Sequence, residues 1–197
     1  MNRTEFTTSF SSKVDWKEVA VDMGISPRYT RLDFKSHPAT APRVEEIRQF
    51  SLKPKGNIFM NGPSGNGKTV TAVAIFASYI HVHGRGARFY NSERLYARWV
   101  SESMNGGAGY LAETLSESPL LVLDDIGQGE VSDNYTRWLY SIINKRWEWE
   151  RPTVVTTNLS GKKFRTYFGD AILSRLTDGK IWKFEGKDHR REAADSD

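Results

Sequence analysis

The segment IFMNGPSGNGKTVTA, residues 58–72, limits the possible folds of this chain more than any other part of the sequence. Four residues separate Gly62 from Gly67, and Lys68 and Thr69 follow directly. The segment therefore matches the full phosphate-binding loop pattern Gly-x-x-x-x-Gly-Lys-[Ser/Thr]. A loop of this kind needs a strand before it and a helix after it, so the neighbouring segments decide whether the match is a nucleotide site.

The rest of the chain alternates between short apolar runs and longer amphipathic stretches. Expected strands cover residues 57–61, 87–91, 119–125, 152–158 and 180–185, and expected helices cover 68–83, 92–103, 132–150 and 170–179. Ser92 and Asp170 are expected to cap two of these helices, and Gly84 and Gly179 to end two. The glycine-rich stretch at 104–110 is expected to be a flexible loop. Alternating strands and helices favour a parallel sheet with helices on both faces.

The composition fits one α/β domain in a reducing compartment. The chain has 197 residues, of which 38% are hydrophobic and 26% charged, enough for one core. It contains no cysteine, no apolar run long enough to span a membrane, and no signal-peptide block near Met1. We therefore expect a cytoplasmic protein that does not contact a membrane.

The net charge of +4 is concentrated towards the C-terminus. Residues 158–191 contain nine basic and four acidic side chains. Such an excess has two interpretations, a surface that binds a phosphate backbone or an ordinary solvated face, and the sequence leaves both open.

The phosphate-binding loop predicts a site for ATP and Mg²⁺. Its glycines allow backbone N–H groups to approach the β-phosphate, and the next helix adds the positive end of its dipole. Lys68 is expected to reach the β- and γ-phosphates, and the Thr69 hydroxyl to bind Mg²⁺. The predicted binding residues are Gly62, Pro63, Ser64, Gly65, Asn66, Gly67, Lys68, Thr69 and Val70.

Two adjacent acids follow the apolar run LLVL, at the carboxyl end of an expected strand. Asp124 is placed to hold the magnesium as a Walker B acid, and Asp125 to polarise the attacking water. Alone, such a pair is more often a turn or a helix cap. Together with a complete phosphate-binding loop, it favours the catalytic interpretation.

Other polar side chains each leave two interpretations open. Asn158, at the end of VVTTN, is either a turn residue or an amide that senses the γ-phosphate, and Arg175 in LSRL is either functional or a surface arginine. Trp147 and Trp149 fit packing better than base stacking.

The motifs GPSGNGKT, LLVLDDIG, PTVVTTNL and DAILSRL, in this order, resemble the AAA+ ATPases of the DnaC/DnaI-type helicase loaders and the IstB-type transposition helpers. The upstream MGISPRYTRLDF is similar to the linker of those families, and FEGKDHR to their ending. The likeness covers about residues 24–190, and it is specific in combination because a phosphate-binding loop alone occurs in many families.

The resemblance implies a three-layer α/β P-loop NTPase with a parallel five-stranded sheet in the order 5-1-4-3-2. It implies that Asn158 is the sensor 1 residue and that Arg175 is an arginine finger for a neighbouring subunit, beside Lys68 and Asp125 in catalysis. It divides the chain into an extension and linker (1–50), an AAA+ ATPase domain (51–190) and a disordered tail (191–197). Two departures leave the partner and the sensor 2 arginine unassigned, since few residues precede the linker and few follow Arg175.

The resemblance favours an ATP-dependent DNA-replication accessory protein. A DnaC-like loader of this kind hydrolyses ATP, binds single-stranded DNA, assembles with nucleotide into a homo-oligomer, and works with a replicative helicase. The alternative is an IstB-like transposition helper that works with a transposase. A small-molecule kinase would need an acceptor pocket and a lid, and a scaffold without turnover does not explain the acids Asp124 and Asp125.

Overall fold

The computed structural model describes residues 14–127 and 132–185 and is built around one parallel sheet. Its strands are β1 (Asn57–Asn61), β2 (Arg88–Asn91), β3 (Leu121–Asp124), β4 (Thr153–Thr157) and β5 (Gly179–Lys183). They pair in the order β2-β3-β4-β1-β5, and every pair is parallel. This is the expected order 5-1-4-3-2 read from the other edge, so the predicted fold class is confirmed.

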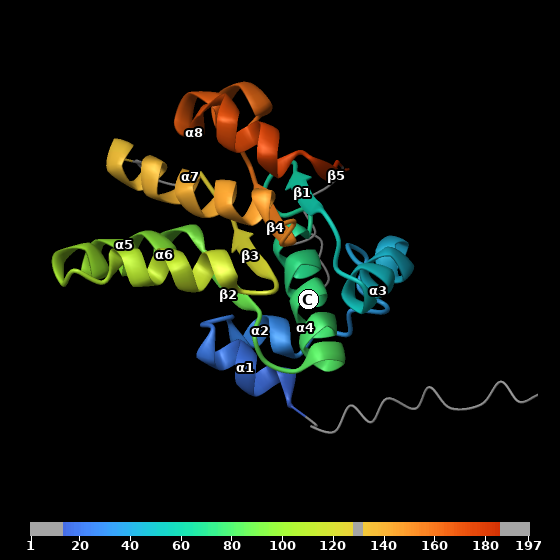
Figure 1. The fold of residues 1–197 in the computed structure, drawn as a ribbon. Helices are drawn as coiled ribbons and strands as arrows, with labels where there is room; N and C mark the ends of the chain where they lie inside the picture. The colour runs from blue at the N-terminus through green and yellow to red at the C-terminus, as the bar shows by residue number, and fades with distance from the viewer. Residues whose placement is uncertain (1–13, 128–131, 186–197) are drawn as a thin grey trace, which may run out of the picture.

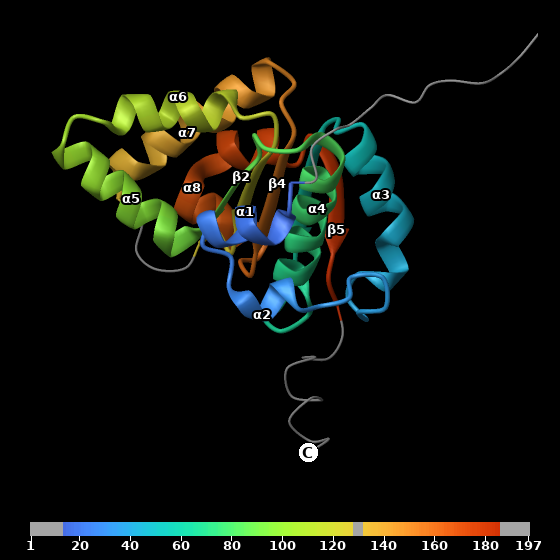
Figure 2. The same cartoon turned by 90° about the horizontal axis from the view of Figure 1, so that it is seen from below.

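Helices cover both faces of the sheet (Figures 1 and 2). The helices are α1 (Trp16–Asp22), α2 (Pro27–Thr30), α3 (Val44–Leu52), α4 (Lys68–His83), α5 (Ser92–Met104), α6 (Ala108–Glu117), α7 (Asp133–Glu148) and α8 (Gly161–Leu176), with a 3₁₀ turn at Ala41–Arg43. None of the described helices is long and apolar enough to cross a membrane.

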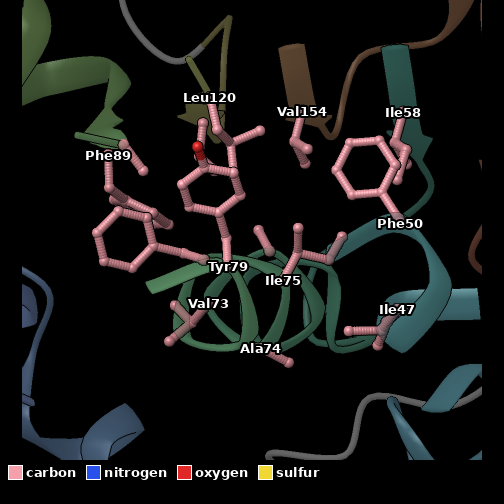
Figure 3. Packing of buried hydrophobic residues seen from close by; sticks show 14 of the residues in the cluster. Ile47, Phe50, Ile58, Val73, Ala74, Ile75, Tyr79, Phe89, Leu120 and Val154 are labelled. Carbon is pink, nitrogen blue, oxygen red and sulfur yellow. The ribbon is translucent and has the colours of Figure 1, made fainter. Parts of the chain in front are cut away.

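One core lies between the sheet and α4. Successive side chains of a strand point to opposite faces, so Ile58 of β1 and Val154 of β4 point towards α4 together with the neighbouring Leu120. Figure 3 shows these side chains above α4, with Phe50 of α3 beside Ile58. Helix α3, which precedes β1 and the phosphate-binding loop, therefore shares this core with the sheet and α4.

A second core lies between the sheet and helices α5 to α8. The strand residues whose side chains point to the other face of the sheet, among them Phe59 and Val155, are buried in it. Phe59 packs edge-on against Phe164 of α8, with ring centroids 5.5 Å apart. Both faces are covered, so the strands read as continuous apolar runs, as parallel strands do.

The structure corrects several predicted boundaries. The loop expected at 104–110 is short, because helix α6 begins at Ala108 and buries Leu111 and Leu115. Helix α8 begins at Gly161 and bends at Gly169 (φ 82°), so Asp170 lies inside it and does not cap it.

Two further corrections concern single positions. Asn91, not Ser92, caps α5, because the Asn91 side chain accepts the hydrogen bond from Arg94 N. Gly179 does not end α8 but begins β5. The domain boundaries proposed from the sequence stay predictions, and the tail at 191–197 lies outside the described residues.

Arg146 of α7 is a fully buried cation at the end of the sheet where β3 and β4 begin. Its guanidinium donates to the carbonyls of Leu115 (2.7 Å), Ser118 (2.7 Å) and Pro152 (2.6 Å). Burial, and secondarily the charge of Arg151, lower its pKa to about 9. The side chain thus ties the end of α6 to the residues that precede β3 and β4.

Candidate nucleotide-binding site

The phosphate-binding loop joins β1 to α4, and two of its glycines lie against other segments. Gly67, at φ 83°, precedes α4, and a Cβ there would lie 2.1 Å from the Cβ of Ala39. Gly62, at φ 153°, would place a Cβ 2.0 Å from the carbonyl oxygen of Phe184. No other residue fits these backbone angles and spaces without displacing a neighbour. The loop is therefore held between the linker and the end of β5.

A cavity of about 400 Å³ opens above the loop. It is lined by Arg28, Tyr29, His37, Ser64, Gly65, Gly67, Lys68, Thr69, Val70, Asp125 and Asn158. This volume is within the range of small-molecule and cofactor sites. Three residues of the predicted binding set, Gly62, Pro63 and Asn66, do not line the cavity. The loop, both strand-end side chains and the linker thus meet around one space.

Lys68 is the first residue of α4, and its side chain folds back over the loop. Its Nζ donates to the carbonyl oxygens of Gly62 (2.7 Å) and Pro63 (2.5 Å). Only 5% of the residue is exposed, although it lines the cavity. The ammonium is thus fixed beside the backbone N–H groups at the start of α4, where an anion is favoured.

Asp124, the last residue of β3, is buried next to Thr69. Its carboxylate accepts hydrogen bonds from the hydroxyls of Thr156, at 2.7 Å, and Thr69. Burial and the charge of Asp125 raise the pKa of Asp124 to about 6, and the two hydroxyl hydrogen bonds and Lys68 oppose this shift.

The Asp124 and Thr69 side chains fit a magnesium site of the P-loop kind. Mg²⁺ is usually held there by one or two protein oxygens together with phosphate oxygens and water. The Asp124 carboxylate is buried beside a hydroxyl and has a raised pKa, so a bound divalent cation would stabilise its ionised form. No cluster of three or more His, Asp or Glu ligands occurs in the described part of the chain.

Asp125 and Asn158 meet across the ends of β3 and β4. Asp125 adopts a left-handed backbone conformation (φ 59°), and its N–H donates to the Thr156 hydroxyl at 2.8 Å. The Asn158 amide donates to the Asp125 carboxylate at 2.6 Å. Thr156 therefore contacts both acids, by donating to Asp124 and accepting from Asp125.

Arg175 is not part of this cavity. Its side chain lies against α7, where Nε donates to Asn144 Oδ1 at 2.6 Å, and it lines a second cavity that involves Trp147 and Asp178. Lys68, Thr69, Asp124, Asp125 and Asn158 are thus brought together, whereas Arg175 is placed on another surface of the same subunit.

The comparisons with known proteins agree with this geometry. The model of the family described as IstB-like ATP binding protein matches residues 23–183. The chain belongs to this family of ATP-binding proteins. The matched span includes the linker, the phosphate-binding loop, both acids, Asn158 and Arg175.

Two relatives of this IstB-like protein work in different settings. The replicative helicase loader DnaC of Escherichia coli (strain K12) is 24% identical over 169 residues, which cover 81% of this chain and 69% of DnaC. The putative insertion sequence ATP-binding protein y4pL of Sinorhizobium fredii is 30% identical over 125 residues, which cover 61% of this chain and 50% of y4pL.

Solved structures support the fold of the IstB-like protein. The crystal structure of the DnaC helicase loader superposes with a TM-score of 0.68 at 24% identity, over 81% of this chain and 100% of that one. The replication initiator DnaA bound to AMPPCP and single-stranded DNA gives a TM-score of 0.68 at 18% identity, over 87% of this chain and 56% of DnaA.

Sequence reasoning missed four polar residues of the site. Arg28, Tyr29 and His37 of the linker line the cavity, and Thr156 orients the acids. The motif MGISPRYTRLDF contains Arg28 and Tyr29, so the likeness of this segment to the family linker could have located them. His37 and Thr156 carried no such signal, because only the tertiary fold brings them to the loop.

Proposed function

We propose that this IstB-like protein binds Mg²⁺·ATP and hydrolyses it. The observation that carries the proposal is the meeting of Lys68, Thr69, Asp125 and Asn158 around one cavity, with the buried Asp124 hydrogen-bonded to Thr69 behind its wall. A phosphate-binding loop alone would fit nucleotide binding without turnover. A carboxylate and an amide at the adjacent strand ends also supply groups for the attacking water.

Each residue has a separate role in this mechanism. Backbone N–H groups of residues 64–69 bind the phosphates, and Lys68 leaves the carbonyls of Gly62 and Pro63 to pair with the β- and γ-phosphates. Mg²⁺ supplies charge neutralisation of the phosphates, and Asp124 and Thr69 would hold it. Asp125 accepts a hydrogen bond from the attacking water, and Asn158 orients that carboxylate.

Arg175 acts, in this proposal, on the nucleotide of a neighbouring copy. Three observations support a role in trans: the side chain does not line its own cavity, it is partly exposed, and it lies beside a separate surface cavity. A planar guanidinium can stabilise charge that develops on the γ-phosphate. The site is then complete only in a nucleotide-dependent homo-oligomer.

The biological role that we favour is a helicase-loader-like switch in DNA replication. The match to DnaC over 69% of its length supports a replicative helicase as partner. The DnaA structure bound to single-stranded DNA supports contact with that strand. The exposed Lys162, Lys163 and Arg165 on α8 supply positive charge, whereas Lys187, Arg190 and Arg191 of the basic segment lie outside the described residues.

A transposition helper is the second candidate. It is favoured by the family model and by y4pL, whose identity of 30% exceeds that of DnaC over a shorter span. Both candidates share the ATPase and the strand-binding function, so they differ only in the partner protein.

Hydrolysis assays with the purified full chain test the ATPase. Lys68→Ala should weaken ATP binding and abolish turnover, because it removes the charge that meets the phosphates. Calorimetry with Mg²⁺·ATP and a phosphate-release assay give the two readings. Unchanged affinity and turnover in Lys68→Ala would contradict the site, and wild-type protein that binds ATP without hydrolysing it would contradict the enzyme.

DNA and partner binding need separate measurements. Fluorescence anisotropy with a labelled single strand, across a salt series, should show affinity that falls steeply with salt because phosphate contacts release counterions. Binding assays of the ATP-bound protein with the replicative helicase and with a transposase of its own host then discriminate between the two candidates. No affinity for DNA at low salt would remove strand binding from the proposal.

A further inference from the structure

The Arg175 side chain lies in an enclosure formed by one face of α7. Its guanidinium carbon is 5.0 Å from the ring centroid of Tyr140 and 5.3 Å from that of Trp147. Its Nε donates to Asn144 Oδ1 at 2.6 Å. These three residues, which we call the α7 cradle, occur at helical spacings of four and three and so share one face of the helix.

The cradle is itself fixed by hydrogen bonds. Asn144 Nδ2 donates to Glu148 Oε1 at 2.7 Å, which turns the amide oxygen towards Arg175. The Trp147 indole N–H donates to Asp178 Oδ2 at 2.6 Å. The Asn144 amide and the Trp147 ring are thus each held by a second partner, so the α7 cradle is preorganised.

The main chain at Arg175 is fixed as well. The buried Asn57, the first residue of β1, donates from Nδ2 to the Arg175 carbonyl at 2.8 Å. The Asn57 amide oxygen accepts from Thr153 N of β4 at 2.9 Å. The arginine is therefore anchored to the sheet at its backbone and to α7 at its side chain.

The Arg175 guanidinium keeps hydrogen-bond donors available within the α7 cradle. Nε is used by Asn144, and Nη1 donates to the carbonyl of Ala171 at 3.1 Å. Among the described residues nothing accepts a hydrogen bond from Nη2. A cavity of about 340 Å³, lined in part by Ser174 and Thr177, adjoins the side chain. A partly exposed cation with unused donors beside open space is placed to meet an anion.

We propose that Tyr140, Asn144 and Trp147 are positioning residues that hold Arg175 in the orientation needed to serve the nucleotide of a neighbouring copy. This inference rests on the proposed role of Arg175 in trans. A free arginine side chain loses rotamer entropy when it engages a phosphate, and a side chain already held by ring faces and an amide loses less. If the contacts are only packing, they stabilise α7 against α8 and leave catalysis unchanged.

A mixing experiment with full-length variants tests the proposal. The Lys68→Ala protein cannot use its own nucleotide site but retains Arg175, and the Arg175→Ala protein has the complementary defect. Mixing the two should restore part of the ATPase. The cradle is then altered only in the arginine donor, as Lys68→Ala/Trp147→Leu, Lys68→Ala/Asn144→Ala and Lys68→Ala/Trp147→Phe. The matched control is Lys68→Ala/Trp149→Leu, because the Trp149 ring contacts Arg151 and not Arg175.

The expected result is a fall of roughly tenfold or more in restored activity for the Trp147→Leu and Asn144→Ala donors. The Trp147→Phe donor, which retains a ring face, and the Trp149→Leu donor should restore activity as well as Lys68→Ala does. The single Trp147→Leu protein should bind ATP normally and lose turnover, so that kcat falls without a rise in KM. Unfolding temperatures confirm that each variant is folded.

Two outcomes separate the inference from the proposal beneath it. If Lys68→Ala does not restore activity to Arg175→Ala, or if Arg175→Ala alone is fully active, the role of Arg175 in trans is wrong. If mixing restores activity and the Trp147→Leu and Asn144→Ala donors work as well as their parent, Arg175 acts in trans without the cradle, and the inference is wrong.

Discussion

The amide of Asn158 donates a hydrogen bond to the carboxylate of Asp125, with Nδ2 and Oδ1 2.6 Å apart. The two residues follow different strands, so this contact joins the end of β4 to the turn after β3. Within the described ranges 14–127 and 132–185, it fixes the only carboxylate among the residues that line the cavity. Asp125 is also shorter by one methylene than a glutamate would be, which limits its reach to a water molecule.

Asp125→Asn should therefore retain ATP binding and lose hydrolysis by about 10²-fold or more, the range typical of a lost general base. The wild-type protein should already turn over slowly in the absence of DNA and partner. Single-turnover phosphate release measures both. Asp170→Asn, which changes an exposed acid of α8, is the control. Rapid basal turnover, or an active Asp125→Asn protein, would count against the assignment.

The raised pKa of Asp124 predicts a pH-dependent stability. The pKa is about 6 in the folded protein and near 3.8 when unfolded, so between these values the folded state binds the extra proton. Without Mg²⁺, the carboxyl therefore favours folding below about pH 4, and this contribution is lost as the pH rises through about 6.

Asp124→Asn removes this dependence. From about pH 4.5 to about pH 7.5, the free energy of unfolding of the wild type should fall relative to that of the variant by on the order of 2 kcal/mol. Urea unfolding of both proteins without metal measures it. Parallel pH profiles would show that Asp124 titrates normally.

Gly67→Ala should disturb the loop more than a glycine replacement normally does. The added Cβ meets both a left-handed backbone (φ 83°) and the Cβ of Ala39 at 2.1 Å. Gly56→Ala is the matched control, because Gly56 has a φ of 70° and nothing within 4 Å of its added Cβ.

The control should cost about 1–2 kcal/mol of unfolding free energy from backbone strain alone. Gly67→Ala should cost clearly more and also weaken ATP binding. Equal losses in the two variants, with normal ATP affinity, would mean that the linker yields to the methyl group without effect on the site.

Arg146→Met should destabilise the fold by about 3 kcal/mol or more. Four carbonyls and the hydroxyls of Ser118 and Thr153 would lose a buried donor, and unpaired buried acceptors are costly. Arg137→Met makes the same change at an exposed position of α7 and should have little effect. Chemical unfolding compares the two, and similar stabilities would show that the acceptors find other partners.

The sheet was predictable because its signals are local. The apolar runs that form β1, β3 and β4 are each bounded by polar or glycine residues, and the phosphate-binding loop sets the direction of the first strand and helix. Helix α6 was missed because Gly106, Gly107 and Gly109 surround its start, although Leu111 and Leu115 have helical spacing.

The residues that the sequence did not reveal are those whose surroundings come from distant segments. Arg146 reads as one more charge on an amphipathic helix, and only the packing of α6 beside α7 encloses it. His37 reads as a loop residue until the linker is seen to lie over the phosphate-binding loop. The motif residues were predictable because nucleotide chemistry fixes their spacing.

The close contact between the linker and the phosphate-binding loop bears on attempts to dissect the protein. A shortened chain that starts at β1 would keep every motif residue, yet it would remove Ala39 from behind Gly67 and Arg28, Tyr29 and His37 from the cavity wall. It would also uncover the apolar face of α4 that Phe50 now shields. A minimal catalytic fragment of this protein must therefore begin upstream of Arg28, and sequence motifs alone would place its boundary too late.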